Sequence, residues 1–112
     1  MRLAIRRIIL FTEHMTGMAA FYGDVLGLEL LTDDAGWKEF GGGGCKLSLH
    51  RGKATPGAKP PKLVFYAADV AEARALLVAR GAAMGKLKAS ATLTLAEGKD
   101  PDGNPFQISN RP

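Results

Sequence analysis

Two stretches of the chain place apolar residues at helical spacing, and shorter alternating stretches surround each of them. The first helical stretch starts near Thr16, a plausible N-cap, and ends at Gly27, a residue type that favours helix C-termini. The second starts at the N-cap Asp69 and ends at Gly81. Their apolar faces consist of Met18, Ala19, Phe21, Tyr22, Val25 and Leu26, and of Val70, Ala73, Leu76, Leu77 and Ala79. The pattern therefore predicts two amphipathic helices.

The remaining apolar segments are short and alternate with polar residues, which is typical of half-buried strands. Glycine, proline and aspartate separate these segments, as they do at turns. The four consecutive glycines 41–44 predict a hairpin tip, and the segment 96–103 contains further turn residues. The predicted strands are 3–11, 28–31, 37–40, 45–50, 62–67, 82–87, 89–95 and 106–109.

The order strand, helix, three strands occurs twice, with a linker rich in proline and glycine at 53–61 between the two copies. The string Gly44-Cys-Lys-Leu-Ser-Leu in the first half aligns with Gly103-Asn-Pro-Phe-Gln-Ile in the second. We therefore predict an α+β fold of two βαβββ repeats, about 1–52 and 62–112, within one domain of residues 1–112. Two such repeats can join into a cup-shaped mixed sheet with the helices outside, and a cup is a common place for a ligand.

Composition and charge narrow the possible partners. Apolar residues make up 46% of the chain and charged residues 23%, the balance of a globular protein. The formal net charge is +4, but the basic residues are scattered and no aromatic residues alternate with them, so we expect no nucleic-acid partner. The single cysteine, Cys45, excludes an intrachain disulfide. No signal peptide or membrane span is evident, so we expect a cytoplasmic protein.

Three strings carry a resemblance to a known superfamily: Phe21-Tyr-Gly-Asp-Val-Leu-Gly-Leu-Glu-Leu, Ala68-Asp-Val and Asp100-Pro-Asp-Gly-Asn-Pro-Phe-Gln-Ile. They lie at the first helix end, the second helix start and the closing turn and strand. In this arrangement the chain resembles the vicinal oxygen chelate superfamily, which includes glyoxalase I, extradiol dioxygenases, fosfomycin-modifying enzymes and bleomycin-resistance proteins. The resemblance covers nearly the whole chain and implies a glyoxalase-like cup and, in many members, a homodimer.

The resemblance also implies a divalent metal, held by histidine and carboxylate side chains from the first and last strand of each repeat. In this sequence those positions fall on Arg7, Ser48, Lys62 and Gln107. Arginine has no lone pair for a metal, and a protonated lysine repels one. None of the four is an imidazole or carboxylate, the usual ligands of such metals. We therefore expect no metal and no other cofactor.

Three further residues are candidates for a ligand site. His50 follows Ser48 by two positions and so shares its strand face. Glu39 can point into the cup or lie in a surface salt bridge, and Trp37 can line a pocket or belong to the core or an interface. His50 is also the better of the two histidines as a metal ligand, since His14 lies at the entry to the first helix.

Arg7 and Lys62 together favour a ligand that is a small anionic or polar organic molecule. Alternatively, both residues pair with Asp or Glu or occupy a dimer interface. The leading hypothesis is a metal-independent binding protein, similar to the bleomycin-resistance proteins, with no catalytic residues assigned. A metal-dependent lyase, isomerase or dioxygenase with its ligands elsewhere is the alternative. A regulatory or interaction subunit whose own side chains fill the cup is the third hypothesis.

Overall fold

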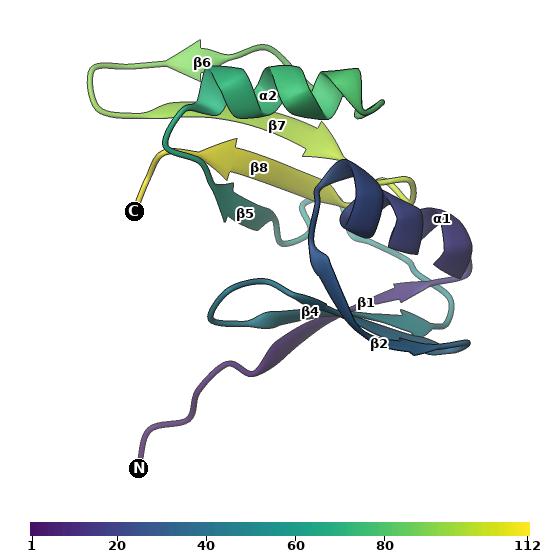
Figure 1. The fold of residues 1–112 in the computed structure, drawn as a ribbon. Coiled ribbons are helices and arrows are strands. Elements are labelled where there is room, and N and C mark those ends of the chain that lie inside the picture. Colours follow the sequence, from purple (N-terminus) through teal and green to yellow (C-terminus); the bar gives the residue numbers. More distant parts are fainter. The chain divides into compact units, whose positions relative to one another are not determined.

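The computed structural model describes residues 1–112, which form two compact units, Met1–Thr55 and Pro56–Pro112. Each unit consists of a four-stranded mixed sheet and one helical segment, in the order strand, helix, three strands (Figure 1). The α+β class and the two βαβββ repeats are thus confirmed. The single-domain assignment stays a prediction. No helix is long and apolar enough to cross a membrane.

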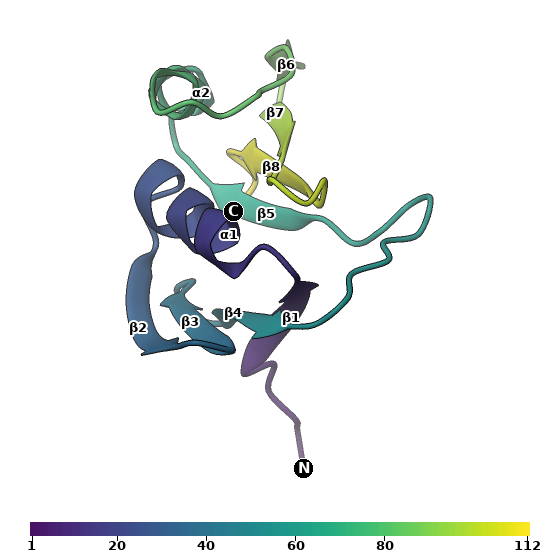
Figure 2. The same ribbon diagram turned by 90° about the vertical axis from the view of Figure 1, so that its right-hand side faces the viewer.

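The first unit forms a sheet with one helical segment on one of its faces (Figure 2). Its strands have the spatial order β1-β4-β3-β2, with β1 parallel to β4 and the other neighbours antiparallel. The helix passes from α-helical into π-helical geometry, and Gly27 follows its end with a φ of 77°. The elements are β1 (Arg7–Thr12), α1 (Met15–Ala20), η1 (Phe21–Val25), β2 (Glu29–Asp34), β3 (Trp37–Gly41) and β4 (Lys46–Arg51).

The second unit repeats this topology, with the spatial order β5-β8-β7-β6 and β5 parallel to β8. Its helix contacts β7 and β8 (Figure 1). The predicted N-cap is confirmed, because the Asp69 carboxylate accepts a hydrogen bond of 3.0 Å from the backbone N–H of Glu72. The elements are β5 (Leu63–Tyr66), α2 (Val70–Ala79), β6 (Lys88–Ala89), β7 (Thr94–Lys99) and β8 (Pro105–Ser109).

The two faces of each sheet differ because successive side chains of a strand point to opposite sides. On the face that packs against α1, Phe40 lies opposite Leu47, and both are buried. In the second unit, Phe106 and Ile108 alternate with Gln107 and are buried as well. Burying such large apolar side chains stabilises the fold by roughly 1.5–3 kcal/mol each. The opposite faces carry polar side chains together with apolar ones that stay partly exposed.

Several predicted boundaries are wrong. The first strand begins at Arg7 rather than at residue 3, because residues 1–5 have no partner strand and Arg6 makes only one backbone hydrogen bond to Lys46. The first helix begins at Met15 with His14 at its N-cap, so Thr16 lies inside the helix. The strand predicted at 28–31 continues to Asp34, since its pairing with β3 extends to the turn.

The largest error concerns the segment 82–99. Two strands were expected at 82–87 and 89–95, followed by turns, but the structure forms only the short β6 and then β7 at Thr94–Lys99. The inward positions of β7 are small residues, the fully buried Ala96 and then Gly98. A Cβ atom at Gly98 would lie 2.6 Å from the ring of Phe106, so this glycine permits close packing within a strand instead of marking a turn.

Candidate functional site

Two strand pairs place polar residues at equivalent positions in the two sheets. Ser48 of β4 lies opposite Glu39 of β3, and Gln107 of β8 lies opposite Glu97 of β7. The alignment of the strings beginning at Gly44 and Gly103 had already matched Ser48 with Gln107. The sheet register follows that alignment.

The first strands of the two sheets are equivalent in the same way. Ile9 lies opposite Ser48 in the parallel pair of β1 and β4, and Val64 lies opposite Gln107 in the pair of β5 and β8. Arg7 and Lys62 each precede these partners by two residues and so lie on the same faces. The four positions that the family resemblance implies are therefore two equivalent pairs. Arg7 and Ser48 form the pair in the first unit, and Lys62 and Gln107 form it in the second.

In both units, the first-strand cation is paired with the third-strand glutamate. Arg7 Nε donates to Glu39 Oε2 at 3.0 Å, and Lys62 Nζ donates to Glu97 Oε1 at 3.3 Å. The sequence left open whether these cations have acidic partners within the chain, and the structure supplies both. The Lys62 pair is solvent-exposed, with 43% and 42% of the two side chains accessible, whereas only 9% of the Glu39 side chain is accessible.

Glu39 is the most completely bonded polar side chain of this face. Besides Arg7, it accepts hydrogen bonds from the Ser48 hydroxyl at 3.1 Å and from the Trp37 indole N–H at 3.2 Å. The hydrogen bond from Arg7 is the main cause that lowers the pKa of Glu39, with Trp37 and Ser48 adding to it and burial opposing it. Glu39 is therefore an anion at neutral pH, and it orients an arginine, a tryptophan and a serine.

Three aromatic rings lie beside this polar cluster on the same sheet face. The His50 ring makes edge contacts with Phe11, at a centroid distance of 5.4 Å, and with Trp37, at 5.6 Å. The guanidinium carbon of Arg7 lies 6.0 Å from the Trp37 ring centroid, a distance compatible with a cation–π contact. Phe11 is 48% exposed, so part of this aromatic surface is open. We call Arg7, Phe11, Trp37, Glu39, Ser48 and His50 the aromatic–polar face.

The structure therefore brings five of the seven predicted site residues together on one sheet, namely Arg7, Trp37, Glu39, Ser48 and His50. Lys62 and Gln107 lie on the equivalent face of the second unit, where Val64 and Tyr66 are exposed. Nothing in that unit corresponds to the three-ring cluster. The first unit thus has both the bonded polar side chains and the cluster of rings, and it is the better candidate for a ligand site.

The residues of the aromatic–polar face do not fit the divalent metal that the superfamily resemblance implies. Arg7 has no lone pair to offer, and both carboxylate oxygens of Glu39 accept hydrogen bonds from the protein. The Ser48 hydroxyl donates a hydrogen bond to the same carboxylate. The chain contains no group of three or more His, Cys, Asp or Glu side chains arranged to hold a metal ion.

Two residues of these faces were missed in the sequence, Glu97 and Phe11. Glu97 precedes Gln107 by ten positions, nearly the spacing of nine between Glu39 and Ser48. The internal repeat, extended by one strand, is the signal for it, but the turn residues of the segment 96–103 predict turns there instead. Phe11 lies two residues after Ile9 on the same strand face, and the alternation of β1 was the available signal.

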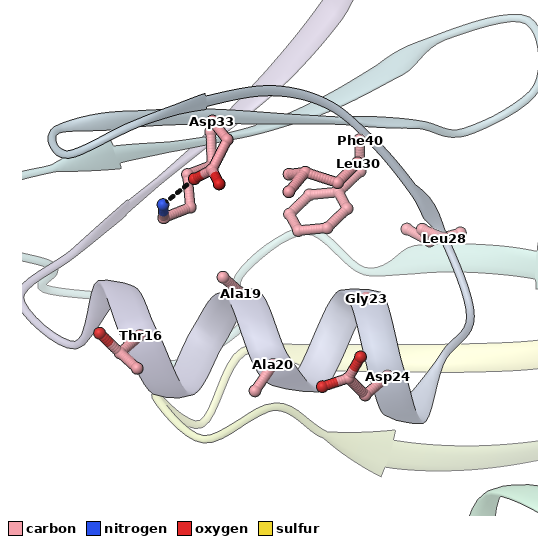
Figure 3. A pocket seen from close by; sticks show the side chains of 10 residues that line it. Thr16, Ala19, Ala20, Gly23, Asp24, Leu28, Leu30, Asp33 and Phe40 are labelled. Atoms are coloured by element: carbon pink, nitrogen blue, oxygen red, sulfur yellow. Dashed lines mark hydrogen bonds and ion pairs between the residues drawn. The ribbon is translucent and has the colours of Figure 1, made fainter.

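A separate pocket of about 390 Å³ lies on the opposite, helix-facing side of the first sheet (Figure 3). Ala19, Ala20 and Gly23 line it from the helix, and Leu30 and Phe40 line it from the sheet. An ion pair between Lys38 and Asp33 lies at its edge. Because Lys38 and Glu39 point to opposite faces of β3, this pocket is not part of the aromatic–polar face.

Comparison with known proteins agrees with this architecture. A family model described as a glyoxalase-like domain matches residues 7–109. Comparison with curated proteins gives no match. The chain belongs to the family of glyoxalase-like domains, and the resemblance noted in the sequence is confirmed.

Solved structures of this superfamily share the fold at low sequence identity. An antibiotic-binding protein from Streptomyces, TnmS3, is 24% identical over 96% of this chain and 94% of its own, with a TM-score of 0.79. A glyoxalase/bleomycin resistance protein/dioxygenase family enzyme from Burkholderia phytofirmans is 20% identical over 96% and 98%, with a TM-score of 0.82. A lactoylglutathione lyase from Agrobacterium tumefaciens is 24% identical over 95% and 92%, with a TM-score of 0.74. These proteins are described as having different activities, and their likeness to this chain is one of fold.

Proposed function

We propose that this protein binds a small organic molecule without a metal and that the aromatic–polar face is its binding surface. The observation that carries the proposal is that Arg7, at a position where the superfamily resemblance implies a metal ligand, is paired within the protein and still partly exposed. Its Nε is bound to Glu39, its guanidinium lies near Trp37, and 38% of its side chain remains accessible. Such a residue can present donors to a ligand but cannot coordinate a metal.

The same surroundings define the class of ligand. A guanidinium has five N–H donors, and the hydrogen bond to Glu39 uses only the one on Nε. The other donors suit a carboxylate or another planar polar group. The rings of Phe11, Trp37 and His50 suit a flat apolar body beside that group. We therefore propose an aromatic or otherwise planar molecule that carries one anionic or strongly polar group.

The likeness to a protein described as antibiotic-binding is in keeping with this proposal. A metal-dependent lyase, isomerase or dioxygenase would need a ligand set that Arg7, Ser48, Lys62 and Gln107 do not provide. A cytoplasmic homodimer remains our expectation for the assembly.

The proposal is tested with 2-naphthoate as the ligand probe and 2-naphthamide as its neutral counterpart. Trp37 is the only tryptophan, so its indole N–H gives a single NMR signal at the centre of the face. We expect 2-naphthoate to shift this signal saturably and to bind more tightly than the amide, with no change when EDTA is added. In Arg7→Ala the affinity for 2-naphthoate should fall roughly tenfold or more, because a hydrogen bond to a charged group is lost.

Lys38→Ala is the matched control for this variant. Lys38 is a cation of the same sheet, it is also paired with a carboxylate, and it points to the opposite face of the sheet. We expect Lys38→Ala to bind 2-naphthoate as the wild type does. Equal weakening by both variants, or binding that requires an added divalent ion, would contradict the proposal.

A further inference from the structure

A second concavity lies in the second unit and has a different chemical character. It has a volume of about 540 Å³, within the range of small-molecule pockets. The segment 56–60 ahead of β5 forms one side, and residues of β7, β8 and their connecting turn form the other. The lining side chains with a formal charge are Lys59, Lys62 and Lys99, and none is acidic. We call this concavity the lysine pocket.

Two of these three lysines form no ion pair with an acidic side chain of the protein. Lys62 is paired with Glu97 at 3.3 Å, but Lys59 and Lys99 are exposed and form no ion pair. Like charges around one concavity repel each other, and a bound anion removes that repulsion. The remaining lining is proline, glycine and alanine, so no other side chain in it competes for the lysine ammonium groups.

We propose that the lysine pocket is a binding site for a compact phosphate-type polyanion. A lysine ammonium is a compact point charge with three donors, a chemistry that suits phosphate oxygens, whereas planar carboxylate recognition favours arginine. The volume accommodates a diphosphate group with part of an attached molecule. This site goes beyond the proposed function, because Lys59 and Lys99 do not belong to the aromatic–polar face.

The test uses inorganic pyrophosphate as the probe, with calorimetry and backbone NMR at constant ionic strength. We expect saturable binding with shifts at Gly57, Lys99 and Gly103, which line the pocket. We also expect pyrophosphate to bind more tightly than citrate, a polyanion of carboxylates. Citrate that binds as tightly as pyrophosphate would overturn the phosphate assignment.

The variant that removes the site is Lys59→Glu/Lys99→Glu, and the matched control is Lys86→Glu/Lys88→Glu. Both double variants change the net charge equally, and all four lysines are exposed in the second unit, but only the first two line the pocket. We expect the pocket variant to lose tenfold or more in pyrophosphate affinity and the control to lose less than about threefold, the part due to screened long-range attraction.

Equal losses in the two variants would show general attraction to a basic protein and would overturn the site. Absence of saturable pyrophosphate binding by the wild type would overturn it as well. The variant Lys59→Gln/Lys99→Gln removes the two positive charges without adding negative ones, and so separates loss of attraction from new repulsion. It should also lose affinity for pyrophosphate. Because none of these lysines belongs to the aromatic–polar face, binding of 2-naphthoate is measured as a separate readout, and the two proposals can fail separately.

Discussion

At the scale of single residues, Glu39 decides the character of the aromatic–polar face. Its carboxylate is nearly inaccessible and yet ionised, because Arg7, Trp37 and Ser48 all donate to it. The sequence singled out each of these residues but could not show that they are bonded to one another. Their partnership depends on the pairing of β3 with β4, which places Glu39 directly opposite Ser48.

The lowered pKa of Glu39 predicts a specific pH dependence of stability. The folded state binds the Glu39 proton more weakly than the unfolded chain, in which a glutamate has a pKa of about 4.3. The ionised carboxylate therefore stabilises the fold above that value, and this contribution is lost as the pH falls through the lower pKa of the folded state. We expect Glu39→Gln to be less stable than the wild type at pH 7 and to lose less stability on acidification.

Urea unfolding of both proteins between about pH 7 and pH 3 measures this difference. The two free energies of unfolding should approach each other as the pH falls below about 4. A difference that stays constant over the whole range would mean that Glu39 acts through packing and that its charge in the folded state contributes nothing.

At the scale of elements, the repeat was readable in the sequence wherever large apolar residues alternate. β3, β4, β5 and β8 were expected close to where they form, and the N-cap of α2 was found at Asp69. β7 was missed because Ala96 and Gly98 carry almost no hydrophobic signal. The absence of a side chain at Gly98 is dictated by the ring of Phe106 on the neighbouring strand, a tertiary contact that no local pattern encodes.

This explanation of β7 predicts that Gly98→Ala is destabilising. The added methyl group would lie 2.6 Å from the Phe106 ring and 2.7 Å from the Met84 sulfur, so the core must shift, at a cost of roughly 1–3 kcal/mol. Gly17→Ala is the control, because a Cβ atom there meets nothing within 4 Å and the residue lies in α1. It should be neutral or stabilise by about 0.5–1 kcal/mol.

Thermal and urea unfolding of the two variants checks this prediction. If Gly98→Ala proves as stable as the wild type, the close packing of β7 against Phe106 is not what requires glycine at this position.

At the scale of the whole molecule, the repeat explains why both candidate cations have acidic partners. The cation on the first strand and the glutamate on the third occur in both units, so the arrangement Arg7–Glu39 has a counterpart in Lys62–Glu97. The superfamily was recognisable from the sequence, whereas the assignment of its metal positions to Arg7, Ser48, Lys62 and Gln107 stays a prediction. The two glutamates that satisfy these cations became evident only with the strand register.

The central claim of this account is that the chain binds its ligand without a metal. Native mass spectrometry of protein purified without chelator tests it most directly, because it reports bound metal, retained small molecules and subunit number together. We predict a dimer whose mass shows no stoichiometric divalent ion, either with or without an organic molecule. One divalent ion per chain, removed by EDTA together with any bound ligand, would contradict the account and make His50 and Glu39 the first residues to test as metal ligands.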